Sequence, residues 1–212
     1  MTRLLDTGLE QLTVMVYRSG EAAGNAINVS IRGLLNCKDE TETVRELSDI
    51  IGSMTVEIEN KAFELIVKYQ PVASDLRIIN SYMKIAYDFE RYGRYAWDIS
   101  FTQQKLAKIN KCAVSSDLML KLVEKVTGMV NKSVAALKQH DAELAKTLGN
   151  TEKEVDELYF AYLNKLSKAR SKDKCVMCNL LVSRYLERIA DHTTYVGEAI
   201  VYIDTGEKII LR

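Results

Sequence analysis

Apolar residues recur at alternating steps of three and four along almost the whole chain, and this spacing constrains the fold more than any other feature. One apolar stripe along a helix has this spacing, whereas the alternation typical of a half-buried strand is absent. One proline stands among the 212 residues, against about ten expected at ordinary usage. Because proline breaks a helix interior, its near absence permits long helices. The stripes begin at Leu5, Val44, Ile78, Leu118, Leu144 and Val182. They predict six long helices and an all-α fold.

The six predicted helices divide into two similar halves. Residues 89–94, Phe-Glu-Arg-Tyr-Gly-Arg, lie in the third helix and are echoed by residues 186–191, Leu-Glu-Arg-Ile-Ala-Asp, in the sixth. Such self-similarity is typical of one structural unit used twice. The sequence therefore predicts two tandem three-helix bundles of antiparallel helices, over residues 1–109 and 110–212, with a short tail after the sixth helix. No linker rich in Gly, Ser or Pro separates the halves, so we expect them to pack together.

Polar residues mark the expected ends of several helices. Asp39 is placed to cap the second helix and Asp141 the fifth, because a carboxylate accepts hydrogen bonds from the first free N–H groups of a helix. Gln70 and Pro71 end the second helix, and Ser74 or Asp75 can open the third.

Charge and motif content exclude several classes of protein. The chain has 29 basic and 29 acidic residues, whereas a nucleic-acid-binding protein needs a basic surplus. Its longest uncharged stretch, residues 22–31, has ten residues, well short of the roughly 18 that a membrane helix needs. The first residues lack the apolar core of a signal peptide, so we expect a cytoplasmic protein. The motifs of P-loops, nucleophile elbows and dinucleotide sites are absent, as is the Glu-x-x-His of di-iron bundles. No enzymatic activity is therefore indicated.

Two carboxylate pairs in the second half form the strongest candidate site. Glu152 and Asp156 are one turn apart on the fifth helix, and Glu187 and Asp191 are one turn apart on the sixth. Residues four apart share a helix face, so up to four carboxylates converge if these helices pack side by side. Their repulsion favours a raised pKa or a bound hard cation such as Mg, Mn, Ca or iron. The alternative is an ordinary acidic helix face, paired with neighbouring cations such as Arg188.

The first half lacks the corresponding acids. Arg94 follows Glu90 by four residues, which is the spacing of an ordinary ion pair, while Ser48 and Gly52 stand where Glu152 and Asp156 stand in the second half. The sequence therefore predicts a metal site in the second half only. His192 points about 100° away from Asp191 around the helix, so we interpret it as a surface or packing residue and at most a peripheral ligand.

Three segments together resemble the PhoU family of phosphate-uptake regulators. Residues 70–77 read Gln-Pro-Val-Ala-Ser-Asp-Leu-Arg, residues 88–91 read Asp-Phe-Glu-Arg, and residues 186–192 are similar to the same family's repeated helix signature. The resemblance spans nearly the whole chain. It implies two three-helix bundles, a cytoplasmic location and a homodimer. It also implies a protein that damps phosphate uptake and phosphate-starvation signalling. The implied partners are the ATPase and other subunits of an ABC phosphate transporter and a membrane sensor histidine kinase, so the protein would meet the membrane only through them.

The same resemblance implies a cofactor and candidate contact residues. Some members carry multinuclear iron or zinc clusters on acid-x-x-x-Asp motifs, one cluster in each bundle. The intact motifs here are Glu152/Asp156 and Glu187/Asp191, so one cluster in the second bundle is expected. The candidate partner-binding residues are Gln70, Pro71, Ser74, Asp75, Arg77 and Arg188.

Three functions are compatible with these features. The leading hypothesis is a non-enzymatic adaptor that docks on transporter and kinase, with a structural or modulatory metal. A metal-dependent enzyme acting on phosphate esters or oxygen is the second, although histidines and nucleophiles that such chemistry recruits are missing. The third is a metal-free helical interaction module, which elemental analysis distinguishes from the first.

Overall fold

The computed structural model describes residues 3–107, 116–168 and 174–212, and within these ranges the chain is helical, without a strand. The long helices are α1 (Leu4–Asn36), α2 (Thr41–Tyr69), α3 (Ala73–Thr102), α4 (Asp117–Gln139), α5 (Ala142–Ser167) and α6 (Lys174–Thr205). A five-residue π-helix, η1 (Gln103–Ala107), extends α3. The predicted all-α fold of six long helices is confirmed. None of the helices described carries an apolar run long enough to span a bilayer.

The helix ends agree with most of the predicted caps. The Asp141 carboxylate accepts a hydrogen bond from the N–H of Leu144 at 2.8 Å, as predicted for the start of α5. Asp39 lies just outside α2, yet its carboxylate accepts the N–H of Thr41, the first residue of that helix, at 3.0 Å. α3 begins at Ala73 after Val72, so the prediction that Ser74 or Asp75 opens this helix was wrong, and both residues lie within its first turn.

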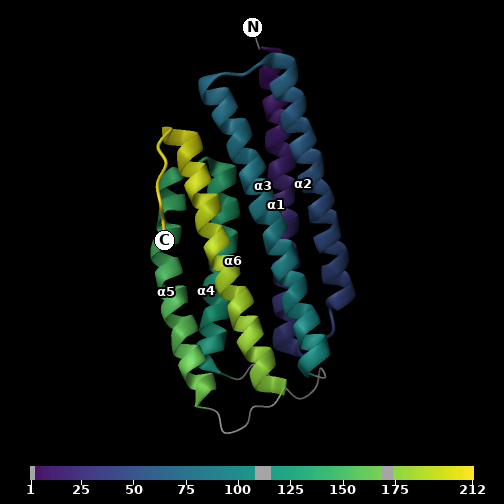
Figure 1. Cartoon of the computed structure of the whole chain (residues 1–212), viewed down its shortest axis with the longest axis vertical. Helices are drawn as coiled ribbons and strands as arrows, with labels where there is room; N and C mark the ends of the chain where they lie inside the picture. The colour runs from purple at the N-terminus through teal and green to yellow at the C-terminus, as the bar shows by residue number, and fades with distance from the viewer. Residues whose placement is uncertain (1–2, 108–115, 169–173) are drawn as a thin grey trace.

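The helices form two bundles that lie against each other (Figure 1). α1, α2 and α3 make the first, and α4, α5 and α6 the second, with successive helices running in opposite directions. α3 packs along α6, and α1 contacts α4, so the halves share a long interface as expected. The predicted boundary between residues 109 and 110 lies outside the described residues.

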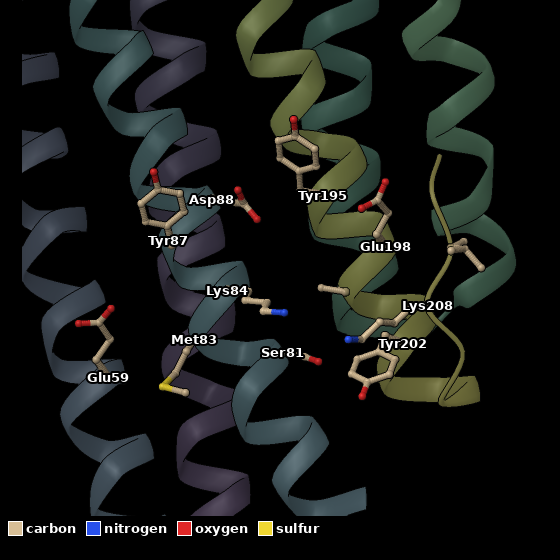
Figure 2. Close-up of a pocket in the computed structure, with 12 residues that line it drawn as sticks. Glu59, Ser81, Met83, Lys84, Tyr87, Asp88, Tyr195, Glu198, Tyr202 and Lys208 are labelled. Atoms are coloured by element: carbon tan, nitrogen blue, oxygen red, sulfur yellow. The ribbon is translucent and has the colours of Figure 1, made fainter. Parts of the chain in front are cut away.

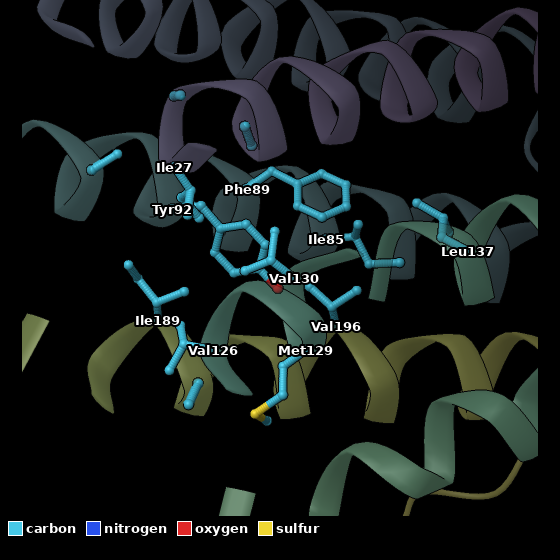
Figure 3. Close-up of a cluster of buried hydrophobic side chains, with 14 of the residues drawn as sticks. Ile27, Ile85, Phe89, Tyr92, Val126, Met129, Val130, Leu137, Ile189 and Val196 are labelled. Atoms are coloured by element: carbon cyan, nitrogen blue, oxygen red, sulfur yellow. The ribbon is translucent and has the colours of Figure 1, made fainter. Parts of the chain in front are cut away.

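One hydrophobic core crosses this interface (Figure 3). It contains apolar side chains from both bundles, among them Ile27, Ile85, Phe89, Tyr92, Val126, Met129, Val130, Ile189 and Val196. Burying a side chain such as Phe89 contributes roughly 1.5–3 kcal/mol. The hydroxyl of Tyr92, in α3, lies 3.1 Å from that of Ser133, in α4, which satisfies both polar groups inside the core. Apolar packing therefore joins the two bundles.

The C-terminal tail folds back along α6. The N–H of Leu211 donates to the carboxylate of Glu198 at 2.9 Å. Gly149 of α5 lies so close to the carbonyl of Leu211 that a Cβ at position 149 would overlap it. The tail thus occupies a defined course over α5 and α6.

Candidate functional site

The packing of α5 beside α6 places the two predicted carboxylate pairs on adjacent helices. Glu152, Glu187 and Asp191 are buried, and Asp156 is partly exposed. A buried carboxylate is costly unless a cation or hydrogen-bond donors compensate its charge. Most of the predicted site residues therefore lie in the interior, where the neighbouring charges and hydrogen-bond donors determine their protonation and their ability to bind a cation.

Three of the four carboxylates influence one another. The pKa of Glu152 is raised, first by burial and then by the negative charges of Asp156 and Glu187, against the opposing charge of Arg212. The pKa of Asp156 is also raised by burial and by Glu187. These shifts are what converging acids produce, as the spacing predicted.

Arginines supply positive charge at the same place. The Glu187 carboxylate accepts hydrogen bonds from Arg184 Nη1 at 2.6 Å and from Arg188 Nε at 2.9 Å. Arg188 also forms an ion pair with Asp191. Because a guanidinium is planar and has several donors, Arg188 can hold Glu187 and Asp191 at once. Glu187 and Asp191 thus pair with a neighbouring arginine, as the alternative interpretation expected, but they are buried rather than on an exposed face.

The donor set suits a hard divalent cation, although the arginines compete for it. Carboxylate oxygens are preferred ligands of such ions, and burial, together with neighbouring acids, raises the pKa of Glu152 and of Asp156. Across the described ranges, however, no three His, Cys, Asp or Glu residues are arranged to hold a metal ion. A cation would have to displace Arg188 or Arg184 from Glu187, so metal binding remains a prediction.

Arg184 and Arg212 are the site residues that the sequence analysis missed. Arg184 precedes Glu187 by three residues, which is an ion-pair spacing on a helix and could have identified it. Arg212 acts on Glu152 only because the tail folds back over α5 and α6. No local pattern signals such a contact.

His192 lies at the interface of the bundles rather than among these acids. Its Nδ1 is 2.7 Å from the carboxylate of Asp88, in α3, and both side chains are largely buried. Burial raises the pKa of Asp88, and the hydrogen bond from His192 opposes that rise. The interpretation of His192 as a packing residue agrees with this position.

The first half has only the predicted ion pair at the matching place. Arg94 Nε lies 3.7 Å from the Glu90 carboxylate on a partly exposed face. Ser48 is buried against α3, close to Gly93, and Gly52 faces open space. These residues provide no acid beside Glu90, and a metal site in the second half only stays a prediction.

The turn between α2 and α3 holds other parts of the structure together. Gln70 and Ala73 adopt left-handed conformations, and Pro71 is buried. The Asp75 carboxylate pairs with Arg3 at 3.0 Å, and the guanidinium of Arg77 lies over the ring of Tyr202, in α6. Asp75 thus pairs with the residue that precedes α1, and Arg77 contacts α6. Gln70 and Ser74 are exposed.

Comparisons with known proteins give a consistent result. A family model described as the PhoU domain matches residues 16–101 and again residues 119–200. A phosphate-specific transport system accessory protein PhoU homolog of Clostridium acetobutylicum is 34% identical over 220 residues, spanning all of both chains. One of the same name from Aquifex aeolicus is 34% identical and covers 94% of this chain and 92% of its own.

Solved structures share the whole fold. The crystal structure of PhoU from Pseudomonas aeruginosa superposes with a TM-score of 0.90 at 26% identity, covering 95% of this chain and 99% of that one. The Streptococcus pneumoniae phosphate transport system regulatory protein PhoU superposes with a TM-score of 0.87 at 21% identity, covering 97% and 99%. The second likeness concerns the fold alone.

Proposed function

This chain belongs to the PhoU family, and on that premise we propose that it is a non-enzymatic regulatory accessory protein of a phosphate-specific transport system. The observation that carries the proposal is the match of the PhoU domain to both halves, together with relatives of equal length that are named accessory proteins of such systems. The site supports it as well, because the acids of α6 are held by Arg184 and Arg188 rather than facing a nucleophile.

We propose in addition that the protein is a negative regulator that docks on the transporter ATPase and on a sensor histidine kinase. Support for a docking face comes from α2. Val56, Phe63 and Val67 lie on this helix with more than half of each side chain exposed. Their steps of seven and four place them along one face, and contiguous exposed apolar residues mark interaction surfaces. The exposed end of the same helix carries Gln70, one of the predicted contact residues.

Co-purification with the ATPase subunit of the host's phosphate transporter tests the docking. We expect Phe63→Ser to weaken the complex about tenfold, the effect of losing one well-packed aromatic anchor. Phe160→Ser is the matched control, because Phe160 is equally exposed on α5. Failure of the unmodified chain to retain the ATPase, in both phosphate-rich and phosphate-starved cells, would contradict the proposal. Equal losses of ATPase binding in Phe63→Ser and Phe160→Ser would contradict the assignment of the docking face to α2.

Negative regulation is tested by phosphate uptake. A strain lacking this protein should take up excess phosphate, and the unmodified chain should restore restraint. Phe63→Ser should restore it poorly, whereas Phe160→Ser should restore it fully. Unchanged uptake in the deletion strain would contradict the assigned direction.

We also propose one metal site, an iron or zinc cluster or another hard cation, at Glu152, Asp156, Glu187 and Asp191. Its role would be structural or modulatory, since a bound cation neutralises acids that otherwise repel one another. Elemental analysis after gentle purification tests this. Asp156→Ala combined with Asp191→Ala should abolish the metal content, and Arg94→Ala in the first half should leave it unchanged. Metal-free protein in all three cases favours the helical interaction module.

The family resemblance carries two further proposals, a homodimer and a cytoplasmic location. Light scattering of the purified chain should give twice the mass of one chain, which is 24.0 kDa. Cell fractionation should find the protein in the cytosol and, through its partners, on the membrane. A monomer at micromolar concentration would contradict the first expectation, and a secreted protein the second.

A further inference from the structure

A cavity of about 550 Å³ lies between α3 and α6, where the two bundles meet (Figure 2). Helix α3, helix α6 and the C-terminal tail provide most of its wall. It is separate from the carboxylates shared by α5 and α6. Its volume falls in the range of roughly 300–1,000 Å³ that small-molecule sites occupy, and it is several times larger than a single inorganic phosphate needs.

Two lysines give the cavity a basic side. Lys84 extends from α3 and Lys208 from the tail, and their amino groups point into the gap from opposite walls. Within the described ranges neither lysine has a carboxylate partner within 4.0 Å; Lys208 lies over the ring of Tyr202. Two unpaired ammonium groups facing one space attract an anion, because like charges repel until a counter-charge binds.

A buried hydroxyl faces the same space. Ser81 is 1% exposed, lines the cavity and has no hydrogen-bond partner among the described residues. Figure 2 shows its oxygen directed across the gap toward Tyr202 and Lys208. A buried hydroxyl is normally satisfied by a partner, and an anionic oxygen between the lysines would accept its hydrogen bond.

Three carboxylates, Glu59, Asp88 and Glu198, share the cavity with the two lysines, and the charge of Lys84 acts on Asp88. Asp88 is engaged by His192, and Glu198 accepts the N–H of Leu211. Glu59 belongs to α2 and lies at the far side of the view from Lys208 (Figure 2). Asp88 and Glu198 thus have hydrogen-bond donors of their own, whereas among the described residues no carboxylate lies within 4.0 Å of either lysine.

Tyrosines line the rest of the wall. Tyr87, Tyr195 and Tyr202 line the cavity, but Arg212 lies over the ring of Tyr195 and Arg77 over that of Tyr202, so the exposed ring of Tyr87 is the open one. Aromatic faces pack against planar rings of a ligand, whereas an inorganic anion has no ring that could stack on them. The polar and aromatic sides together match a molecule with an anionic group at one end and a ring at the other.

We propose that this cavity binds a phosphorylated small molecule of nucleotide size. The phosphate group lies between Lys84, Lys208 and the Ser81 hydroxyl, since lysine acts as a point-charge ligand of phosphate. The base packs against the exposed ring of Tyr87. Because Lys208 belongs to the tail that Glu198 fastens to α6, binding also holds the tail in place.

Titration calorimetry on the full chain tests the site, with AMP, ribose 5-phosphate and inorganic phosphate as probes at one fixed salt concentration. We expect AMP to bind most tightly. Lys84→Gln combined with Lys208→Gln should weaken AMP binding at least tenfold, and Ser81→Ala should weaken it several-fold. Lys121→Gln combined with Lys132→Gln removes the same charge from another cavity, on α4, and should leave AMP binding unchanged.

Each outcome decides the proposal. Loss of AMP binding in the Lys84/Lys208 variant alone supports it. Equal or tighter binding of inorganic phosphate overturns the assignment of a nucleotide-sized ligand. Equal losses in the two double variants indicate non-specific attraction and overturn the site, as does the absence of binding by any probe. The melting temperature of each variant is measured alongside, and because Lys84 and Lys208 are exposed, it should not change.

Discussion

Residues 89–94 of α3 and residues 186–191 of α6 occupy matching positions in the two bundles but carry different charged side chains. In α3, Glu90 is followed by Arg94, and the two form one long, partly exposed ion pair at 3.7 Å. In α6, Glu187 lies between Arg184 and Arg188, and Arg188 also reaches Asp191. The neighbouring helix adds Glu152 and Asp156 in the second half, whereas Ser48 and Gly52 stand at the matching positions in the first. A repeated helical frame thus fixes where a side chain lies, and the residue placed there decides whether a charged site forms.

The interface between the bundles gives a second comparison. When residues 89–94 are matched to residues 186–191, Tyr95 corresponds to His192, and Asp88 corresponds to Tyr185. In the antiparallel pair of α3 and α6, Tyr95 stacks on Tyr185 with ring centroids 6.2 Å apart, and His192 bonds Asp88 at 2.7 Å. Equivalent places in the interface therefore hold an aromatic pair and a polar pair. Substitutions can separate the energetic roles of the two.

Removing His192 should give the largest effect. His192→Leu leaves the Asp88 carboxylate buried without its partner, which costs about 3–5 kcal/mol when a buried pair is broken. Urea unfolding at pH 7 measures the loss. Asp88→Leu combined with His192→Leu removes both polar groups and should recover most of it, because replacing both members of a pair by apolar groups is nearly neutral. A loss below about 1 kcal/mol in the single variant would mean that the pair behaves like a surface contact.

The same variant should change how stability depends on pH. Burial holds the pKa of Asp88 above its value in the unfolded chain, so the folded state keeps the proton at higher pH and stability falls as pH rises above about 4. His192 opposes this rise in pKa. Without it, the pKa of Asp88 rises further, and the fall in stability with pH becomes steeper and extends to higher pH. A parallel shift of the whole stability curve, with no change in slope, would contradict this.

Replacing one glycine by alanine in each of two matching helices should change stability in opposite directions. A Cβ at Gly149, in α5, overlaps the carbonyl of Leu211, so Gly149→Ala should displace the tail at a cost of about 1–3 kcal/mol. A Cβ at Gly52, in α2, would have no atom within 4 Å beyond its own stretch of helix. Gly52→Ala should therefore stabilise the helix by about 0.5–1 kcal/mol. Thermal unfolding measures both. Hydrogen exchange at the Leu211 amide should accelerate in Gly149→Ala, and protection equal to that of the unmodified chain would contradict the proposed displacement.

The sequence was sufficient for features that depend on local spacing. Stripes at steps of three and four predicted six helices, and the echo between residues 89–94 and 186–191 predicted two bundles. The i,i+4 spacing of Glu152 and Asp156 predicted their shared face, and the packing of α5 on α6 brought Glu187 into reach of both. Each of these properties follows from helix geometry within a few turns.

Contacts between distant segments could not be predicted in this way. Asp88 and His192 are 104 residues apart and meet only when the bundles pack. Arg212 reaches Glu152 because the tail turns back after α6. The cavity at Lys84 and Lys208 likewise combines a helix of the first bundle with the tail. Spacing within a helix carries no information on such pairings, which depend on the crossing of helices and the course of the tail.

Neutralising one acid of the second half should have a smaller effect on the melting temperature. The direction of the change indicates whether a metal is bound. In metal-free protein Glu152 is repelled by Asp156 and Glu187, so Glu152→Gln should raise the melting temperature. The rise should not exceed about 2–4 °C, which corresponds to ~1 kcal/mol in a chain of this size. Glu90→Gln, in the first half, should change it by less than about 1 °C, the effect of an exposed ion pair. Scanning calorimetry with a chelator and then with added zinc or iron gives the comparison. If the proposed metal binds, Glu152→Gln should lower the melting temperature in its presence.

The smallest expected effect comes from giving the first half one missing acid. Arg94→Asp completes an acid-x-x-x-Asp motif with Glu90, and like charges four residues apart on a helix cost about 0.2–0.5 kcal/mol. The metal content should not change, because Ser48 and Gly52 still provide no carboxylates on α2. Arg94→Gln is the control for the lost ion pair, and elemental analysis after exposure to zinc or iron is the measurement. Adding Ser48→Glu and Gly52→Asp to Arg94→Asp supplies all four acids on the frame of the first bundle. A gain of metal only in this triple variant would mean that the halves differ in their acids and not in their backbone, whereas a gain from Arg94→Asp alone would show that two carboxylates suffice.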